Sequence, residues 1–333
     1  MSPKIKLGYS IGPQTAYYGA KAALDLVGRA EKAGFDSLWI ADHFLPFFHK
    51  GAHSPQAWVL ISSALERTDR VPVGSEVTVP MYKYHPLIVA HAFATMANVY
   101  PGRVIFGVGT GEAINEFPFI NRWPSWKERA ETLFEALSLI KTYWTSDDYF
   151  DFEGKFFRIK KVMCYDKPPE PVPILVSAAG PKMARMTGEK GYSILADATL
   201  EKAREVVYPV HERAAIAFGH DPTKMEKAML IGIGYGNPRE LANRFRPLSA
   251  QMAMFNKAID EPDPRIIETL GKNVDDEFIL ERMFFRSSPK AFVDLINRCV
   301  AAGVQNVILD DWSIKPLETI EMLENEVMSS FRR

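Results

Sequence analysis

Residues 100–116 read YPGRVIFGVGTGEAINE and combine a strand-like run with a glycine-rich turn. The run over 103–108 predicts a buried strand, and the residues after it are rich in glycine and lead to Glu112. A nicotinamide-binding turn follows the pattern GxGxxG, whose sixth position is occupied here by Glu112. Because a carboxylate there would repel a pyrophosphate, we expect the glycines to let the backbone approach a flat ligand closely.

On both sides of this stretch, short strand-like runs alternate with amphipathic helical stretches. The clearest helix is expected over 127–144, where apolar residues recur every three or four positions, and further helices are expected over 20–33 and about 86–99. Eight strand–helix units predict an α/β fold of the (β/α)8 TIM-barrel type with helices outside, and an open doubly wound sheet is the alternative. The expected strands cover residues 5–9, 37–41, 71–77, 103–108, 173–176, 192–196, 228–233 and 304–309.

Composition limits the possible classes of protein. The 333 residues carry a net charge of −1 with no block of like charges, which disfavours nucleic acid or an anionic membrane as a partner. The sequence shows no secretory signal and no long apolar run, and Cys164 and Cys299 form no CxxC pattern, so we expect a cytoplasmic protein. Without a composition break, residues 1–333 are expected to form one domain, with insertions at approximately 42–55, 110–126, 147–170 and 237–285.

Polar residues follow the expected strands at the end where barrel enzymes place their active sites. Glu112 is a candidate acid or base, and the alternative is a solvated loop carboxylate. Asp42 and His43 are candidates for binding a polar cofactor ring and for general base catalysis, and the alternative is that they cap the loop. His49 and His53 lie four residues apart without an HExxH pattern, so we expect no metal site.

The segment Ser177-Ala178-Ala179-Gly180 follows the fifth expected strand and precedes a helix. Small residues at a helix N-terminus allow backbone N–H groups to bind a phosphate-sized anion. The alternative is an ordinary tight turn between strand and helix.

At these strand ends the sequence resembles the coenzyme F420-dependent branch of the luciferase-like superfamily, nearest to its glucose-6-phosphate dehydrogenase and secondary-alcohol dehydrogenase members. The resemblance covers nearly the whole chain. Its most specific part is GVGTGEAINE at 107–116, and the supporting parts are ADHF at 41–44, HAFATM at 91–96, YPGRV at 100–104 and AGP at 179–181.

The resemblance implies a bacterial luciferase-like barrel with insertions that forms a homodimer, binds coenzyme F420 and acts on a small molecule. It implies that the segment 177–180 holds the coenzyme phosphate and that a non-prolyl cis peptide lies behind the deazaflavin at Glu76-Val77. The residues expected to contact the coenzyme are Asp42, Glu76, Val77, Asn115, Ser177, Ala178, Ala179 and Gly180.

The resemblance also implies a mechanism. His43 takes the substrate hydroxyl proton while hydride passes from the carbinol carbon to the deazaflavin, and Glu112 donates a proton to that ring. Deazaflavin carries hydride rather than single electrons, so the protein must supply proton transfer and positioning. Phe47 stands where family members commonly carry Trp, and it keeps the aromatic wall but lacks the indole N–H donor.

The glucose-6-phosphate members place two lysines and an arginine around the sugar phosphate. An ungapped alignment puts Leu200 and Asn256 at the lysine positions and Arg282 at the arginine position. Two lost charge-assisted contacts cost about 1.5–3 kcal/mol each, although Lys202 or Lys257 would compensate after a small shift. We therefore expect an alcohol or another non-phosphorylated hydroxyl compound as the substrate.

Four alternatives stay open at this point. The chain is also compatible with an F420-dependent methylene-tetrahydromethanopterin reductase, an F420-dependent glucose-6-phosphate dehydrogenase, or a luciferase-like monooxygenase that uses FMN. A coenzyme-binding module without chemistry is the fourth. A carboxylate at Glu112 suits both F420 classes, but the Asp42-His43 pair is more similar to the alcohol enzymes.

Overall fold

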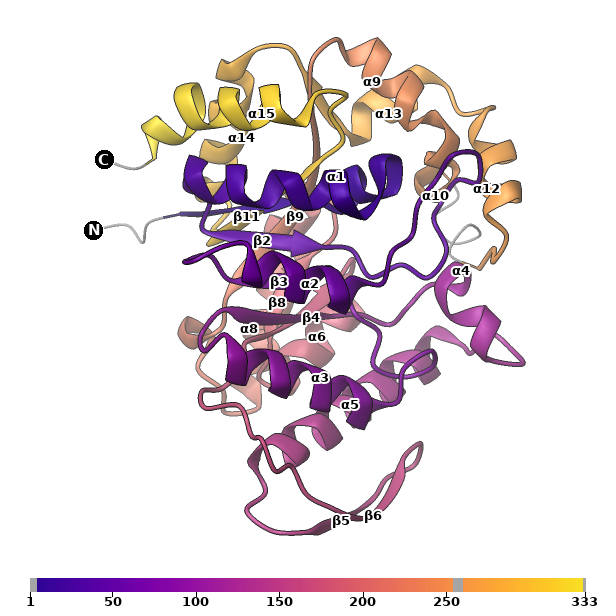
Figure 1. The fold of residues 1–333 in the computed structure, drawn as a ribbon, viewed down its shortest axis with the longest axis vertical. Helices are drawn as coiled ribbons and strands as arrows, with labels where there is room; N and C mark the ends of the chain where they lie inside the picture. Colours follow the sequence, from indigo (N-terminus) through magenta and orange to yellow (C-terminus); the bar gives the residue numbers. More distant parts are fainter. Residues whose placement is uncertain (1–4, 254–259, 332–333) are drawn as a thin grey trace.

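The computed structural model describes residues 5–253 and 260–331, and its centre is a closed barrel of eight parallel strands (Figure 1). The strands follow the order β9-β11-β1-β2-β3-β4-β7-β8, and pairing of β8 with β9 closes the ring. The predicted barrel is confirmed, and the open sheet is wrong. The strands are β1 (Lys6–Ser10), β2 (Ser37–Ile40), β3 (Val73–Ser75), β4 (Val104–Val108), β7 (Ile174–Ala178), β8 (Ser193–Ala196), β9 (Lys227–Tyr235) and β11 (Asn306–Asp311).

Helices surround the barrel on its outside (Figure 1). The expected helix over 86–99 has these same bounds, and the one over 127–144 extends by one residue at each end. The first helix begins earlier than expected, at Gly12, because Pro13 occupies its first turn and Gly19 provides a kink with φ of 78°. These helices are α1 (Gly12–Ala33), α2 (Ala57–Glu66), α3 (Pro86–Val99), α5 (Trp126–Thr145), α6 (Pro181–Glu189), α8 (Tyr208–Ala217), α14 (Pro289–Ala301) and α15 (Pro316–Met322).

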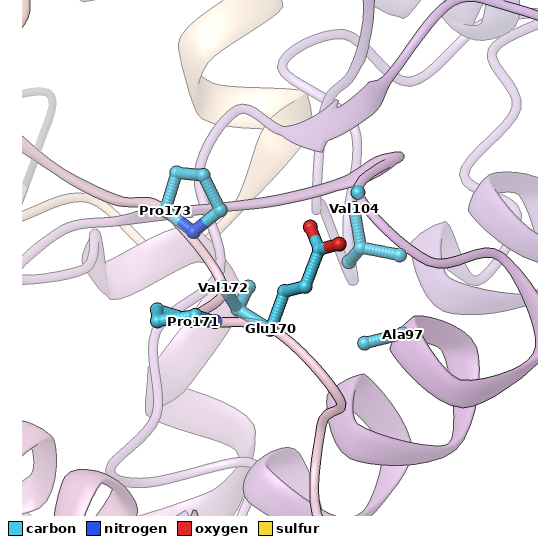
Figure 2. Close-up of a pocket in the computed structure, with 7 residues that line it drawn as sticks. Ala97, Val104, Glu170, Pro171, Val172 and Pro173 are labelled. Atoms are coloured by element: carbon cyan, nitrogen blue, oxygen red, sulfur yellow. The ribbon is translucent and has the colours of Figure 1, made fainter.

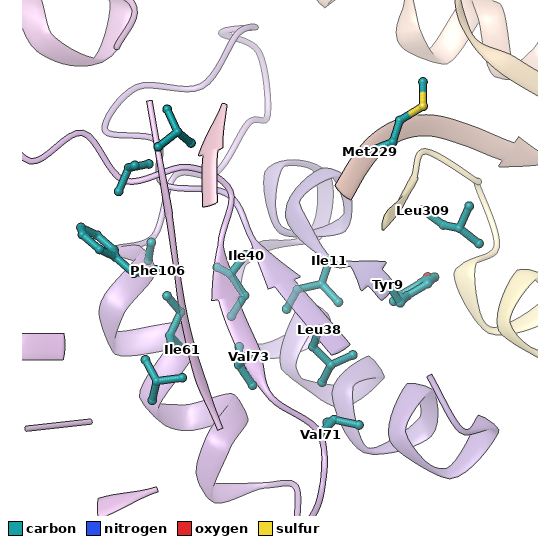
Figure 3. Close-up of a cluster of buried hydrophobic side chains, with 14 of the residues drawn as sticks. Tyr9, Ile11, Leu38, Ile40, Ile61, Val71, Val73, Phe106, Met229 and Leu309 are labelled. Atoms are coloured by element: carbon teal, nitrogen blue, oxygen red, sulfur yellow. The ribbon is translucent and has the colours of Figure 1, made fainter. Parts of the chain in front are cut away.

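Side chains alternate between the inside of the barrel and the helical layer. Leu38 and Ile40 on β2 belong to the outer cluster of buried hydrophobic residues (Figure 3), whereas Trp39 between them packs inside the ring. Two glycines on neighbouring strands leave room for the indole. A Cβ on Gly74 would lie 2.6 Å from Trp39 Cζ3, and one on Gly8 would lie 2.8 Å from Trp39 Nε1. The barrel interior is therefore shaped around one large side chain.

The remaining elements extend from the barrel between its repeats. An antiparallel hairpin, β5 (Phe150–Glu153) and β6 (Arg158–Val162), projects away from the barrel at the bottom of Figure 1. The region after β9 is mostly helical and also contains a short strand, unpredicted from the sequence, that pairs in parallel with the end of β9. Its elements are α9 (Pro238–Phe245), α10 (Ala250–Ala253), α12 (Pro264–Gly271), α13 (Asp276–Arg282) and β10 (Phe284–Arg286).

Two helical segments from this region cover the end of the barrel where β4 stops. The short helix α4 (Ala113–Glu116) follows β4, and its Ile114 packs against Ala250 of α10 and Ile267 of α12. The chain after β2 joins the same cluster through Leu45 and Phe47. In the part of the chain that the structure describes, no helix is long and apolar enough to cross a membrane.

Candidate active site

The loop after β2 places His43 at the carboxyl end of the barrel. Part of the imidazole remains exposed, and the Phe47 ring lies edge-on to it with 4.6 Å between the ring centroids. Ser54 Oγ donates a hydrogen bond of 2.9 Å to the His43 carbonyl, which fixes the backbone of the loop. His43 and Phe47 are thus brought together.

The Asn115 side chain joins this loop to the segment after β4. Its Oδ1 accepts hydrogen bonds from the backbone N–H groups of Phe44, at 2.8 Å, and Leu45, at 3.3 Å. Its Nδ2 lies 3.1 Å from His43 Nδ1 and 3.4 Å from Glu112 Oε2. One amide therefore contacts both the imidazole and the carboxyl group, and the two candidate proton-transfer residues share the same end of the barrel.

The environment of Glu112 favours its protonated form. Burial, together with the nearby Asp197 carboxylate, raises the pKa of Glu112 to about 7. Gln251 on α10 donates a hydrogen bond of 3.3 Å to Glu112 Oε1, which favours the ionised form but does not outweigh burial. The carboxyl group can thus both hold and release a proton near neutral pH.

The environment of His43 favours its neutral form. Burial lowers the pKa of His43 to about 4, and the Lys83 ammonium group acts in the same direction. The neighbouring Asp42 carboxylate opposes this shift. At neutral pH the imidazole is therefore uncharged, which lets it exchange hydrogen bonds as either a donor or an acceptor.

A network of buried charged side chains connects the loop that carries His43 with the short helix α4. Lys83 Nζ lies 3.0 Å from Asp42 Oδ1 and 3.8 Å from Glu116 Oε1, and each of the three side chains is at most 1% exposed. Thr78 Oγ1 donates a 2.7 Å hydrogen bond to the second Asp42 oxygen, and the Lys83 backbone N–H donates to Glu116 Oε2. Asp42 therefore has both carboxylate oxygens engaged within the protein.

A second group of acids lies at the ends of β3 and β11. A non-prolyl cis peptide joins Glu76 and Val77, as the resemblance implied. Ser10 Oγ donates a 3.0 Å hydrogen bond to Glu76 Oε1, while Glu76 Oε2 and Asp310 Oδ1 are buried and have no partner among the residues that the structure describes. Burial and the Asp310 charge raise the pKa of Glu76 well above its usual range, and burial raises that of Asp310 to about 7.

The turn after β7 leaves a helix N-terminus open. Ser177 and Ala178 end the strand, and Gly180 precedes α6 without a side-chain hydrogen bond to the first helical N–H groups. Among the described residues, nothing lies within 4 Å of where a Cβ on Gly180 would stand. The turn around Ala179 therefore has space for an anion beside a helix N-terminus without a side-chain cap, although Pro181 contributes no N–H.

The whole chain is similar in sequence to known proteins of one family. The sequence profile of the luciferase-like monooxygenase family matches residues 5–305. The chain belongs to this family. It is 32% identical over 336 aligned residues to the F420-dependent glucose-6-phosphate dehydrogenase of Segniliparus rotundus, covering 100% of this chain and 99% of the relative. An enzyme of the same name from Rhodococcus erythropolis is 31% identical, with coverage of 100% and 99%.

Two solved structures have the same architecture as this chain. An F420-dependent secondary alcohol dehydrogenase in complex with an F420-acetone adduct is 32% identical, with a TM-score of 0.92 over 98% of this chain and 99% of the other. A coenzyme F420-dependent tetrahydromethanopterin reductase from Methanopyrus kandleri is 21% identical, with a TM-score of 0.78 and coverage of 99% and 100%. The second similarity shows the fold alone.

Of the two predicted substrate residues in this luciferase-like chain, the structure describes only Arg282. Arg282 ends α13, where its guanidinium lies 3.5 Å from the centroid of the Phe278 ring and 3.7 Å from a Glu281 oxygen. Among the described residues, no hydrogen bond or ion pair links it to His43 or Glu112. Asn256 lies outside the described residues.

Sequence reasoning missed Lys83, Glu116, Asp310 and Gln251. Lys83 and Glu116 look like ordinary polar loop and helix residues, because nothing in their local pattern signals that the fold buries them. Asp310 follows a strand-like run, so the rule that singled out Asp42 and Glu112 would have found it. Gln251 reaches Glu112 across 139 positions, which no short motif could indicate.

A small cavity occupies the opposite end of the barrel (Figure 2). It is lined by Val104, the first residue of β4, by Pro173, directly before β7, and by Glu170, whose carboxyl group points into the space between them. Because catalytic residues of parallel barrels lie at the carboxyl ends of the strands, this cavity plays no part in the site around His43.

Replacing Lys83 by methionine tests the buried charge network. Lys83→Met keeps the length of the side chain but leaves the Asp42 carboxylate without its buried counter-charge, so we expect the free energy of unfolding to fall by about 3–5 kcal/mol. Lys21→Met is the matched control, because Lys21 forms an ion pair with Asp25 but is 88% exposed, and we expect it to cost at most about 1 kcal/mol. Urea unfolding measures both, and equal losses would contradict the role given to Lys83.

Proposed function

We propose that this chain is a coenzyme F420-dependent dehydrogenase that transfers hydride between a carbinol carbon, of an alcohol or sugar, and the deazaflavin ring. The observation that carries the proposal is the meeting of His43 and Glu112 through the Asn115 amide at the barrel end. The 32% identity to F420-dependent dehydrogenases along almost the entire length supports the choice of coenzyme. The reaction class therefore rests on local geometry and on family likeness together.

The residues at the barrel end fit a coenzyme with a flat ring and an anionic chain. We propose Glu76, Val77 and Asn115 as contacts of the ring, with Asp42 behind them holding the loop. The open turn over 177–180, consisting of Ser177, Ala178, Ala179 and Gly180, would receive the phosphate. The deazaflavin would supply a hydride-accepting and hydride-donating carbon when it is bound.

The protein's own groups would move the protons. We propose that His43 exchanges a proton or a hydrogen bond with the substrate oxygen and that Phe47 forms the aromatic wall beside it. Glu112 would hold the second proton at its carboxyl group and release it toward the coenzyme ring during alcohol oxidation. The neutral imidazole and the carboxyl group of pKa about 7 suit these two tasks near neutral pH.

The charges at the barrel end favour a substrate without phosphate. Glu76 and Asp310 each bury an oxygen that has no partner among the described residues, and Asp310, with a pKa raised to about 7, repels a phosphate dianion when it ionises. Arg282, the one basic residue expected for a sugar phosphate, already contacts Phe278 and Glu281. We therefore infer an alcohol or another uncharged hydroxyl compound as the substrate.

The resemblance leads us to propose a homodimer, and the two cysteines lead us to propose that it works in the cytoplasm. Cys164 and Cys299 are both buried and form no disulfide, which fits a reducing compartment. Sedimentation of the purified protein should give twice the mass of the chain. A mass of one chain would remove the dimer from the proposal.

Turnover with F420 tests the function directly. Oxidised F420 mixed with the protein and a series of secondary alcohols should lose its visible absorbance as hydride reduces the ring. His43→Ala should bind F420 in a titration but lose turnover, whereas His49→Ala, which alters an exposed neighbouring histidine, should keep both.

Each competing function predicts a different result in this assay. Faster turnover of glucose 6-phosphate than of any alcohol would overturn the substrate inference. Turnover of methylene-tetrahydromethanopterin alone would favour the reductase, and preferential binding of FMN with NADH-driven oxygen uptake would favour a monooxygenase. Unchanged turnover by His43→Ala would contradict the mechanism.

The proposed proton transfer by Glu112 predicts that the rates of the two reaction directions depend on pH in opposite ways. Alcohol oxidation requires the protonated carboxyl group, so its rate should fall as the pH rises through about 7. Carbonyl reduction by reduced F420 requires the carboxylate, so its rate should rise over the same interval. Single-turnover rates measure both, with Glu112→Gln as the control that lacks the titrating group. The same dependence in both directions would refute the role of Glu112.

A further inference from the structure

The orientation of the Asn115 amide is fixed by the backbone beside it. Two N–H groups, of Phe44 and Leu45, point at the same atom, Oδ1, at 2.8 and 3.3 Å. The reverse orientation would place the NH2 group against two other donors and leave both without an acceptor. The atom that faces His43 is therefore Nδ2, which can only donate.

This orientation determines which imidazole nitrogen carries the proton. Asn115 Nδ2 lies 3.1 Å from His43 Nδ1, so Nδ1 must offer its lone pair and the neutral ring must carry its hydrogen on Nε2. An imidazolium has hydrogens on both nitrogens and would set N–H against N–H. Lys83 also opposes the imidazolium, whereas a hydrogen bond of the ring with the Leu45 backbone and the Asp42 and Glu112 carboxylates, when ionised, favour it.

We propose that Asn115 is a positioning residue that holds His43 as the neutral tautomer protonated on Nε2, so that the ring meets the substrate oxygen as a hydrogen-bond donor. The consequence for turnover rests on the function proposed above. Nε2 is the ring nitrogen that Asn115 does not contact, and a substrate carbonyl oxygen can accept a hydrogen bond from it. The resting site is therefore set to recognise the carbonyl form.

Proton uptake from an alcohol needs the other tautomer. The hydroxyl O–H bond can break and an Nε2–H bond can form only if the ring starts with its proton on Nδ1, and the product is an imidazolium. Neither the ring protonated on Nδ1 nor the imidazolium can accept the hydrogen bond from Asn115. Alcohol deprotonation by His43 thus requires a rearrangement that carbonyl recognition does not.

Nitrogen-15 NMR of the histidine-labelled full chain, without coenzyme, tests the tautomer. Long-range proton–nitrogen spectra, assigned by the signals lost in His43→Gln, should show Nδ1 unprotonated and Nε2 protonated. Asn115→Asp keeps the acceptor for Phe44 and Leu45 but replaces the donor by a carboxylate oxygen. The ring proton should then move to Nδ1, and the ring should titrate at a higher pH.

The variant is made in a Glu112→Gln background so that two carboxylates do not face each other, and Glu112→Gln alone is the control. A proton on Nδ1 in the wild-type spectrum would overturn the inference whether or not the variant folds. A proton that stays on Nε2 in the folded double variant would also overturn it. The predicted tautomers in a protein without F420 turnover would support this inference and contradict only the proposed function.

Discussion

Trp39 fills the inside of the barrel, and the arrangement of the strand ends depends on it. The indole occupies space that Gly8 and Gly74 leave open on adjacent strands. Its Nε1 donates to Ser37 Oγ, so the one polar atom of this large side chain is satisfied inside the ring. A closed barrel filled in this way fixes where β2, β3 and β4 end, and the loops that follow them start from defined positions.

The loops add a second level of constraint, which is electrostatic. The Lys83 ammonium group balances the charges of the Asp42 and Glu116 carboxylates, which are buried away from water. The Asn115 amide joins the loop that carries His43 to the segment that carries Glu112. Burial then shifts the pKa of His43 down and that of Glu112 up, so a neutral base and a neutral acid coexist at neutral pH. This pairing is what hydride chemistry needs from the protein, because the coenzyme carries no proton relay of its own.

The sequence predicts the helices and strands and their order along the chain well. It predicts poorly which polar residues become buried through contacts with distant parts of the chain. The helix expected over about 86–99 agrees with α3, because Pro86 marks its start and the apolar spacing marks its buried face. The proximity of His43 and Glu112 followed from the rule that parallel strands end on one side. The three-residue strand β10 was missed because so short a run has no periodicity, and Lys83 was missed because only the folded chain encloses it.

The central claim is that His43 and Glu112 act on the same bound ring. A crystal structure of the protein with coenzyme F420 tests it most directly. We predict that the deazaflavin contacts both side chains at the carboxyl ends of the strands, with its phosphate at the 177–180 turn. Coenzyme bound elsewhere, or a ring that only one of the two residues reaches, would contradict the account.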